Sequence, residues 1–292
     1  MKWPTITRVE GQNPWVTYAK RQVTVKNNCI NLMVTSPPGM GKSWGLLSYF
    51  YIIDPDFDMQ ERCLFGVLPL IKYFKKAKEE YIKGKPIMYD ESGVESHALN
   101  YRDELNVGLN MFLQTGRSLN YIFGMTVPFV SFVSKGVRTL MNCHFRANGW
   151  NSKNESIFKP LVTEWNDVQQ KFYNKRLLVR DNGKITYCNE ILIPKLPTKI
   201  LNEYEKLKKE FQDKLYGDII GKIESRDIKK EESKLVKCYK VAGKLGVSTH
   251  TILNWVNKGE IKARQIGKFW FMTTEQSEKL LNKPTLLGNG GK

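Results

Sequence analysis

The feature that most constrains this chain is the eight-residue segment Ser36–Ser43, SPPGMGKS, which joins two apolar segments. The preceding residues, Cys29–Thr35, predict a buried strand, and the following residues, Ser43–Ile53, predict an apolar helix. Gly39 and Gly41 allow positive φ values and let a ligand approach the backbone closely. Because the backbone amides at the start of a helix point toward a bound anion, such a loop is a binding site for phosphate. The segment therefore predicts a strand–loop–helix phosphate site in an α/β domain.

The side chains of this loop predict which phosphate compound it binds. The loop resembles the GPPGxGKS form that is common in ATPases, except that Ser36 replaces the first glycine. In such a loop Lys42 reaches the β- and γ-phosphates, and the Ser43 hydroxyl binds Mg²⁺. ATP and Mg²⁺ are therefore the expected cofactors, and an ordinary strand-to-helix turn is the alternative. The residues expected to contact ATP are Ser36, Pro37, Pro38, Gly39, Met40, Gly41, Lys42, Ser43 and Trp44.

A second element, Pro86–Ser92 (PIMYDES), places two adjacent carboxylates at the end of an apolar strand. Asp90 is expected to hold Mg²⁺ directly or through water, and Glu91 to polarise the water that attacks the γ-phosphate. Alone, such an acidic pair could merely begin a turn. After a phosphate loop it indicates the Walker B motif. Because a second acid follows Asp90, the motif resembles that of the P-loop ATPases that have an additional strand and a catalytic Glu, rather than that of the nucleotide kinases.

Three residues further along are candidates for contacting the γ-phosphate. Thr126 ends the strand predicted over 121–126, where such ATPases place a polar sensor. The FtsK/HerA translocases usually have Gln there, so Thr126 departs from their pattern. Arg117 and Arg138 could each act within the chain or, as an arginine finger, across a subunit interface. Arg138 is the preferred finger and Arg117 the preferred structural or sensor residue, and an ordinary surface or ion-paired arginine is the alternative for both.

The order of these motifs resembles that of a known group of ATPases. Residues 25–195, with QTGR.LNYIFGMTVP and VRTLM after the two Walker elements, resemble the viral and plasmid ATPases around FtsK, HerA and the zonula occludens toxin-like morphogenesis proteins. The resemblance implies a ring-forming homo-oligomer, hexameric in its usual form, that moves DNA. The toxin-like proteins usually carry a membrane span, which this sequence does not predict.

The pattern of apolar segments predicts two folded parts. From Val23 to Pro197, apolar strands alternate with helical stretches, which predicts an α/β domain with a mostly parallel sheet. Within it, Asn182 and Gly183 predict the turn of a β-hairpin. The expected divisions are an N-terminal arm (1–22), a P-loop ATPase domain (23–200), a helix with a charged linker (201–234), a small C-terminal domain (235–284) and a flexible tail (285–292).

The C-terminal segment predicts two short helices and a hairpin. Val241, Ala242 and Leu245 would share one helix face, which Gly246 would end, and Ser248 is a good N-cap for the next helix. Residues 261–271 then predict a β-hairpin with Gly267 at its tip. This arrangement is typical of a helix-turn-helix followed by a wing. The segment resembles the winged helix of the MerR/excisionase type.

The resemblance implies contacts with double-stranded DNA. Nine basic and three acidic residues give residues 235–284 a formal charge of +6. Side chains at the start of the second helix would enter the major groove, and basic side chains would contact phosphates or the minor groove. A helix-turn-helix used for protein contacts is the alternative. The expected DNA-binding residues are Ser248, Thr249, His250, Thr251, Asn254, Lys258, Arg264 and Lys268.

Composition narrows the class of protein. A formal net charge of +17 indicates a polyanionic partner, either nucleic acid or an anionic membrane surface. The most apolar stretches fall short of the roughly 20 residues that a membrane span needs. The five cysteines form no CxxC pair, which predicts reduced thiols without a zinc site. We therefore expect a cytoplasmic protein, in the host cytoplasm or associated with the virion if it is viral.

Together these features predict an Mg²⁺-dependent ATPase that is stimulated by DNA. The preferred function is a DNA motor for translocation or viral genome packaging, loaded by its C-terminal module. The alternatives are a DNA-binding regulator or replication initiator that ATP switches, and a zonula occludens toxin-like morphogenesis ATPase with viral or plasmid assembly partners. Glu91 favours turnover over a mere switch, and the DNA module favours the first two functions over the third.

Overall fold

The computed structural model describes residues 3–90, 102–232 and 235–282. The chain forms two compact units, residues 1–211 and 212–292. Glu91, the expected base, lies outside the described residues. No helix within the described ranges is both long enough and apolar enough to cross a membrane. All five cysteines are free thiols, four of them buried and Cys29 half-buried.

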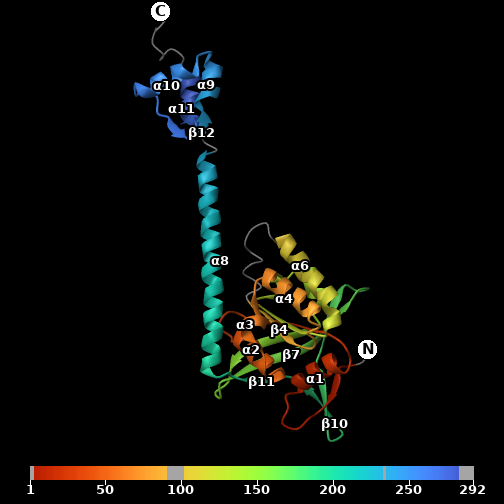
Figure 1. The fold of residues 1–292 in the computed structure, drawn as a ribbon. Helices are drawn as coiled ribbons and strands as arrows, with labels where there is room; N and C mark the ends of the chain where they lie inside the picture. The colour runs from red at the N-terminus through yellow and green to blue at the C-terminus, as the bar shows by residue number, and fades with distance from the viewer. Residues whose placement is uncertain (1–2, 91–101, 233–234, 283–292) are drawn as a thin grey trace, which may run out of the picture. The chain divides into compact units, whose positions relative to one another are not determined.

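The first unit is a mixed α/β fold built on an eight-stranded sheet (Figure 1). The strand order is β11-β7-β6-β2-β5-β4-β3, and β8 pairs with β7. The five strands from β6 to β3 are mutually parallel, whereas β7, β8 and β11 join by antiparallel pairs, so the prediction of a mostly parallel sheet is confirmed. The strands are β2 (Ile30–Thr35), β3 (Cys63–Phe65), β4 (Pro86–Asp90), β5 (Ile122–Val127), β6 (Cys143–Trp150), β7 (Glu155–Asn166), β8 (Lys171–Lys175) and β11 (Ile191–Pro194).

The position of β5 determines where polar residues meet. β5 pairs with β2 on one side and with β4 on the other, so an additional strand separates the phosphate-loop strand from the strand that ends in Asp90. Val34 is paired with Thr126, and Tyr89 with Met125. Because the carboxyl ends of parallel strands meet at one edge of a sheet, this order brings the end of each of the three strands to the phosphate loop.

Helices cover both faces of this sheet. Side chains of β2 alternate between two hydrophobic clusters, with Leu32 and Val34 in one and Met33 in the other. Buried residues of α1 (Pro14–Thr24) and α2 (Lys42–Ile53) belong to the first cluster. α4 (Val67–Glu79), α6 (Arg102–Thr115) and α7 (Lys135–Leu140) supply the second, and Figure 1 shows α4 and α6 side by side. The short elements are α3 (Met59–Arg62), η1 (Gly116–Leu119) and η2 (Val130–Phe132).

Residues 1–22, which the sequence suggests are an arm, contain elements of the folded unit. β1 (Thr5–Thr7) pairs with β9 (Leu177–Asp181), which pairs in turn with β10 (Lys184–Cys188). The Asn-Gly hairpin between β9 and β10 is confirmed, with positive φ at both turn residues. Asn13 caps α1, and Trp15 is 1% exposed in the first cluster. Because this indole packs in the core, the segment is part of the α/β unit.

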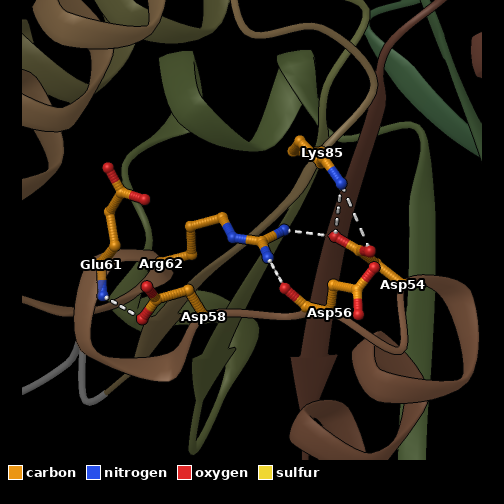
Figure 2. A network of polar contacts seen from close by, with 6 residues as sticks. All are labelled: Asp54, Asp56, Asp58, Glu61, Arg62 and Lys85. Carbon is orange, nitrogen blue, oxygen red and sulfur yellow. Dashed lines mark hydrogen bonds and ion pairs between the residues drawn. The ribbon is translucent and has the colours of Figure 1, made fainter.

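A polar network holds the end of α2 that lies far from the phosphate loop (Figure 2). Asp54 is the C-cap of α2, and its carboxylate accepts a hydrogen bond of 2.5 Å from the buried Arg62 of α3. The same guanidinium donates to the Asp56 carbonyl at 2.6 Å and lies 4.7 Å from the centre of the Phe57 ring. Lys85, just before β4, approaches Asp54 at 3.2 Å. The network therefore links α2, α3 and the start of β4.

α8 (Thr198–Glu232) is a single helix of 35 residues. It continues through residues 224–232, within the segment 201–234 for which the sequence suggests a helix followed by a charged linker. Residues 224–232 contain no Pro or Gly, and Glu, Lys and Arg are good helix formers. At its beginning, Leu201 and Tyr204 are buried in the first unit.

The second unit is a small α+β arrangement around its own core. Two helices and a hairpin form where the sequence predicts them. Gly246 ends α9 with φ of 69°, and the Ser248 hydroxyl accepts a hydrogen bond from the Thr251 amide at 3.1 Å as the cap of α10. Ile252 and Met272 are central to the hydrophobic cluster. The elements are β12 (Leu235–Lys237), α9 (Cys238–Leu245), α10 (Thr249–Asn257), β13 (Arg264–Ile266), β14 (Phe269–Thr273) and α11 (Thr274–Asn282), with sheet order β12-β14-β13.

Candidate functional site: a phosphate loop and a buried aspartate

The loop between β2 and α2 has the backbone of a phosphate cradle. Gly39 and Gly41 adopt φ values of 81° and 75°, and Gly41 is the N-cap of α2. A Cβ atom on Gly41 would lie 2.7 Å from the indole of Trp150, at the end of β6. A side chain at Gly41 would thus be both strained and blocked, because the loop follows a left-handed path directly against this ring.

The two side chains after Gly41 point into the site. The Lys42 ammonium donates to the Pro37 carbonyl at 3.0 Å, so it lies across the loop. The Ser43 hydroxyl donates to the Asp90 carboxylate at 2.8 Å. Ser36, in place of the usual glycine, is buried, and its hydroxyl donates to the Pro37 carbonyl at 3.1 Å. The loop is therefore closed by its own side chains.

Asp90 is the centre of the polar cluster. It is fully buried at the end of β4, and hydroxyl groups from three different elements donate to its carboxylate. They belong to Ser43 on α2, Thr126 on β5 and Tyr204 on α8. A buried carboxylate needs such donors because burial without hydrogen bonds would cost it several kcal/mol or more. This geometry brings three residues named from the sequence into direct contact.

The oxygen donors in this cluster fit a magnesium ion. Mg²⁺ prefers oxygen ligands, and it is usually held by one or two protein groups together with water and substrate phosphates. Ser43 and Asp90 could provide that pair. Within the described residues there is no group of three or more His, Cys, Asp and Glu side chains that could hold a metal. The Ser43 hydroxyl and the Asp90 carboxylate are therefore oxygen donors of the kind that hold Mg²⁺ together with a nucleotide and water.

Tyr204 is a site residue that the sequence analysis missed. Burial and the charge of Asp90, followed by the hydrogen bond to that carboxylate, raise the pKa of its hydroxyl well above the ordinary value. The group therefore stays protonated and acts as a donor. One signal was available: Leu201, Tyr204, Leu207 and Phe211 repeat at three- and four-residue spacing and pack on the core.

A cavity of about 700 Å³ lies beside the loop. This volume is in the range of small-molecule sites. Lys42 and Lys208 line it, as do Trp44, Phe132 and Trp150. The Trp44 and Trp150 rings meet edge to face with 6.2 Å between their centres. The cavity thus combines cationic groups suited to phosphates with aromatic surfaces suited to a nucleobase.

Trp44 is held in place by its neighbours. Its indole nitrogen donates to the Glu205 carboxylate of α8 at 2.6 Å, and the Lys195 ammonium lies 4.9 Å from the ring centre. These contacts give the aromatic wall of the cavity a defined position.

The two candidate arginines, Arg117 and Arg138, do not contact the polar cluster around Asp90. Arg117 is exposed on η1, before β5, and its carbonyl accepts a hydrogen bond from the Cys29 thiol. β5 has six residues at about 3.3 Å each, so Arg117 and Thr126 lie at opposite edges of the sheet. Arg138 lies on α7 and does not line the cavity beside the loop. Its Nε is buried and has no hydrogen-bond partner among the described residues.

Most of the residues expected to bind DNA are exposed in the second unit. His250, Asn254 and Lys258 follow one another at four-residue spacing along and just after α10, so they share one face. Thr251 is half-buried, and its hydroxyl lies 2.9 Å from that of Ser248. The remaining exposed members of the set are Ser248, Thr249, Arg264 and Lys268.

No protein-family model and no curated protein matches this chain. Among solved structures, the N-terminal domain of the zonular occludens toxin from Neisseria meningitidis is 15% identical with a TM-score of 0.32, over 50% of this chain and 93% of that one. The genome packaging NTPase B204 from Sulfolobus turreted icosahedral virus 2, in complex with AMP, is 9% identical with a TM-score of 0.30, over 52% and 98%. The KaiC-like protein PH0186 from Pyrococcus horikoshii OT3 is 9% identical with a TM-score of 0.33, over 57% and 90%.

Proposed function

We propose that this protein is an Mg²⁺-dependent ATPase that binds ATP in the cavity beside the phosphate loop. The observation that carries the proposal is the 2.8 Å hydrogen bond from the Ser43 hydroxyl to the buried Asp90 carboxylate. It joins the start of α2 to the end of β4 next to a loop with two left-handed glycines. An ordinary strand-to-helix turn requires neither the buried carboxylate nor the second strand.

Each residue of the cluster has a role in this proposal. Lys42 would contact the β- and γ-phosphates, and the amides at the start of α2 would bind the oxygens nearest to them. Mg²⁺, held by Ser43 and Asp90, would supply positive charge against the charge that develops on the transferred phosphoryl group. Thr126 would fix the orientation of Asp90 through its hydrogen bond. We assign Glu91 to the attacking water because it follows Asp90 directly in the sequence.

Mutation of the phosphate loop tests this proposal. Hydrogen bonds to charged groups contribute about 1.5–3 kcal/mol, so Lys42→Ala should weaken ATP binding roughly ten- to a hundredfold. Lys20→Ala, on the exposed side of α1, is the control. Glu91→Gln should retain ATP binding and lose hydrolysis. Equal ATP hydrolysis by Lys42→Ala and Lys20→Ala would overturn the proposal.

We further propose that the ATPase is a DNA motor with a DNA-recognition module of the winged helix-turn-helix type. The shared exposed face of His250, Asn254 and Lys258 and the formal net charge of +17 support a DNA partner. For translocation or genome packaging of DNA we propose a homo-oligomer in the form of a hexameric ring.

The rate of ATP hydrolysis with and without duplex DNA tests the motor. A motor should hydrolyse ATP faster on DNA and displace a third strand from a triplex ahead of it. A DNA-binding regulator that ATP switches should bind DNA more tightly with ATP and displace nothing. A morphogenesis ATPase should show no response to DNA.

A further inference from the structure

A second cavity, of about 640 Å³, lies over the antiparallel part of the large sheet. It shares no lining residue with the cavity beside the phosphate loop. Its charged lining residues are Arg146 on β6, Lys159 on β7, Arg176 between β8 and β9, and Glu190 before β11. All four are exposed. Since the Glu190 carboxylate lies 3.9 Å from the Lys159 ammonium, the cavity keeps a net positive charge from its two arginines.

The two arginines are available to a ligand. Neither guanidinium has an ion-pair partner among the residues that the structure describes, and Arg176 lies 5.9 Å from the centre of the Tyr187 ring. Guanidinium groups bind phosphate with two parallel hydrogen bonds. The amides of Asn174 and Asn189, which also line the cavity, are further hydrogen-bond donors.

We propose that this cavity is a groove for the sugar–phosphate backbone of DNA, distinct from the contacts made by the second unit. The other lining residues are Pro160, Leu161 and His144, so the lining has no Trp, Tyr or Phe ring on which a nucleobase could stack as it could beside Trp44. Its cations are spread over several strands, which suits a row of phosphates better than one small anion.

The groove is linked to the phosphate loop through one strand pair. Arg146 on β6 is the register partner of Thr35, the last residue of β2, which directly precedes the loop. His144, two residues before Arg146, places its Nε2 2.7 Å from the Thr35 hydroxyl. Burial, followed by the charge of Arg146, lowers the pKa of His144, so the contact is made by a neutral ring at neutral pH. The DNA backbone, when bound at Arg146, would therefore lie one strand away from the ATP site. We expect this contact to couple DNA binding to ATP hydrolysis, an expectation that rests on the proposed ATPase function.

The test compares two double variants of the full chain. Arg146→Gln/Arg176→Gln removes the two groove arginines, and Lys20→Gln/Lys26→Gln removes the same charge from exposed positions on and after α1. Binding of a fluorescent duplex of arbitrary sequence is measured over a series of salt concentrations. Each phosphate contact contributes roughly 0.9 to the slope of the logarithm of the DNA-binding constant against the logarithm of the salt concentration. The magnitude of this slope should therefore fall by about 1–2 in the arginine variant and by less in the lysine variant.

The ATPase arm of the experiment separates this inference from the proposed function. The arginine variant should hydrolyse ATP at the wild-type rate without DNA and should lose most of the stimulation by DNA. If the wild-type chain hydrolyses no ATP, the proposed function is wrong. The salt dependence of DNA binding would still test whether the groove binds DNA. An arginine variant with the slope of the lysine variant would overturn the groove. Binding of polyglutamate that depends equally on the two arginines would also overturn it, in favour of an acidic peptide.

Discussion

The Tyr204 hydroxyl donates a hydrogen bond to the Asp90 carboxylate across 114 positions of sequence. The contact joins the first turns of α8 to the strand that carries the proposed Mg²⁺ ligand. Glu205 and Lys208, on the same turns, line the cavity beside the phosphate loop. The beginning of α8 is therefore part of the candidate site and not a simple connector.

The Tyr204→Phe variant should be less stable than wild type by about 1.5–3 kcal/mol, because a buried carboxylate would lose one of its donors. The ring itself would keep its packing next to Phe65. Urea unfolding measures the difference, and Tyr216→Phe, at an exposed position of the same helix, is the matched control. Equal losses in both variants would contradict a role for the Tyr204 hydroxyl.

The Gly41→Ala substitution should abolish tight ATP binding, because it combines a positive φ with a methyl group 2.7 Å from the Trp150 indole. Two further variants separate these causes. Gly39→Ala has a similar φ but open space around the added Cβ, so it should be less damaging. Trp150→Ala removes the obstructing ring, so Gly41→Ala should cost less affinity when it is added to Trp150→Ala than when it is added to the wild type. Titration with a fluorescent ATP analogue ranks the variants, and identical affinities for Gly39→Ala and Gly41→Ala would show that the Trp150 contact is unimportant.

The network of Figure 2 should make stability depend on pH through Asp54. Burial tends to raise the pKa of this carboxyl, but hydrogen bonds and charges from Arg62 and Lys85 outweigh burial and lower the pKa below its ordinary 3.8. The unfolded chain then binds the proton more readily, so the network stabilises the fold above the ordinary pKa and loses its effect as pH falls through the native pKa. The difference in unfolding free energy between wild type and Asp54→Asn should therefore be constant near neutral pH and shrink below about pH 4. Glu10→Gln, at an exposed position, is the control, and a difference that grows on acidification would refute the assignment.

The sequence predicts the parts of this structure that depend on adjacent residues. The loop with Lys42 and Ser43 and the strand that ends in Asp90 are contiguous patterns, and each forms where the pattern predicts it. Tyr204 and Trp150 could not be placed in the same way, since their contacts depend on how distant strands and helices pack.

The structures of the N-terminal segment and of α8 likewise could not be predicted from adjacent residues alone. Residues 1–22 are polar and aromatic with two prolines, so the burial of Trp15 depends on a core supplied by the rest of the unit. A charged stretch without Pro or Gly is compatible with both a linker and a helix, and in this chain it continues α8. Composition alone does not separate these two outcomes.

Mixed oligomers test whether Arg138 acts on the ATP of a neighbouring subunit. Within its own chain Arg138 does not line the cavity beside the phosphate loop, and its buried Nε has no partner among the described residues. In the ring that we propose, Lys42→Ala subunits still provide Arg138, and Arg138→Ala subunits still provide an intact phosphate loop. Each variant alone should hydrolyse little ATP, whereas a mixture should regain part of the wild-type rate, because some interfaces then combine both intact groups.

The same mixture made with Arg117→Ala is the comparison for that experiment. Arg117 lies at the edge of the sheet opposite to Thr126, so Arg117→Ala alone should retain its activity and leave nothing for mixing to restore. Recovery that depends on Arg138 alone would assign the finger to α7. If mixing Lys42→Ala with Arg138→Ala restores no hydrolysis, Arg138 does not act in trans.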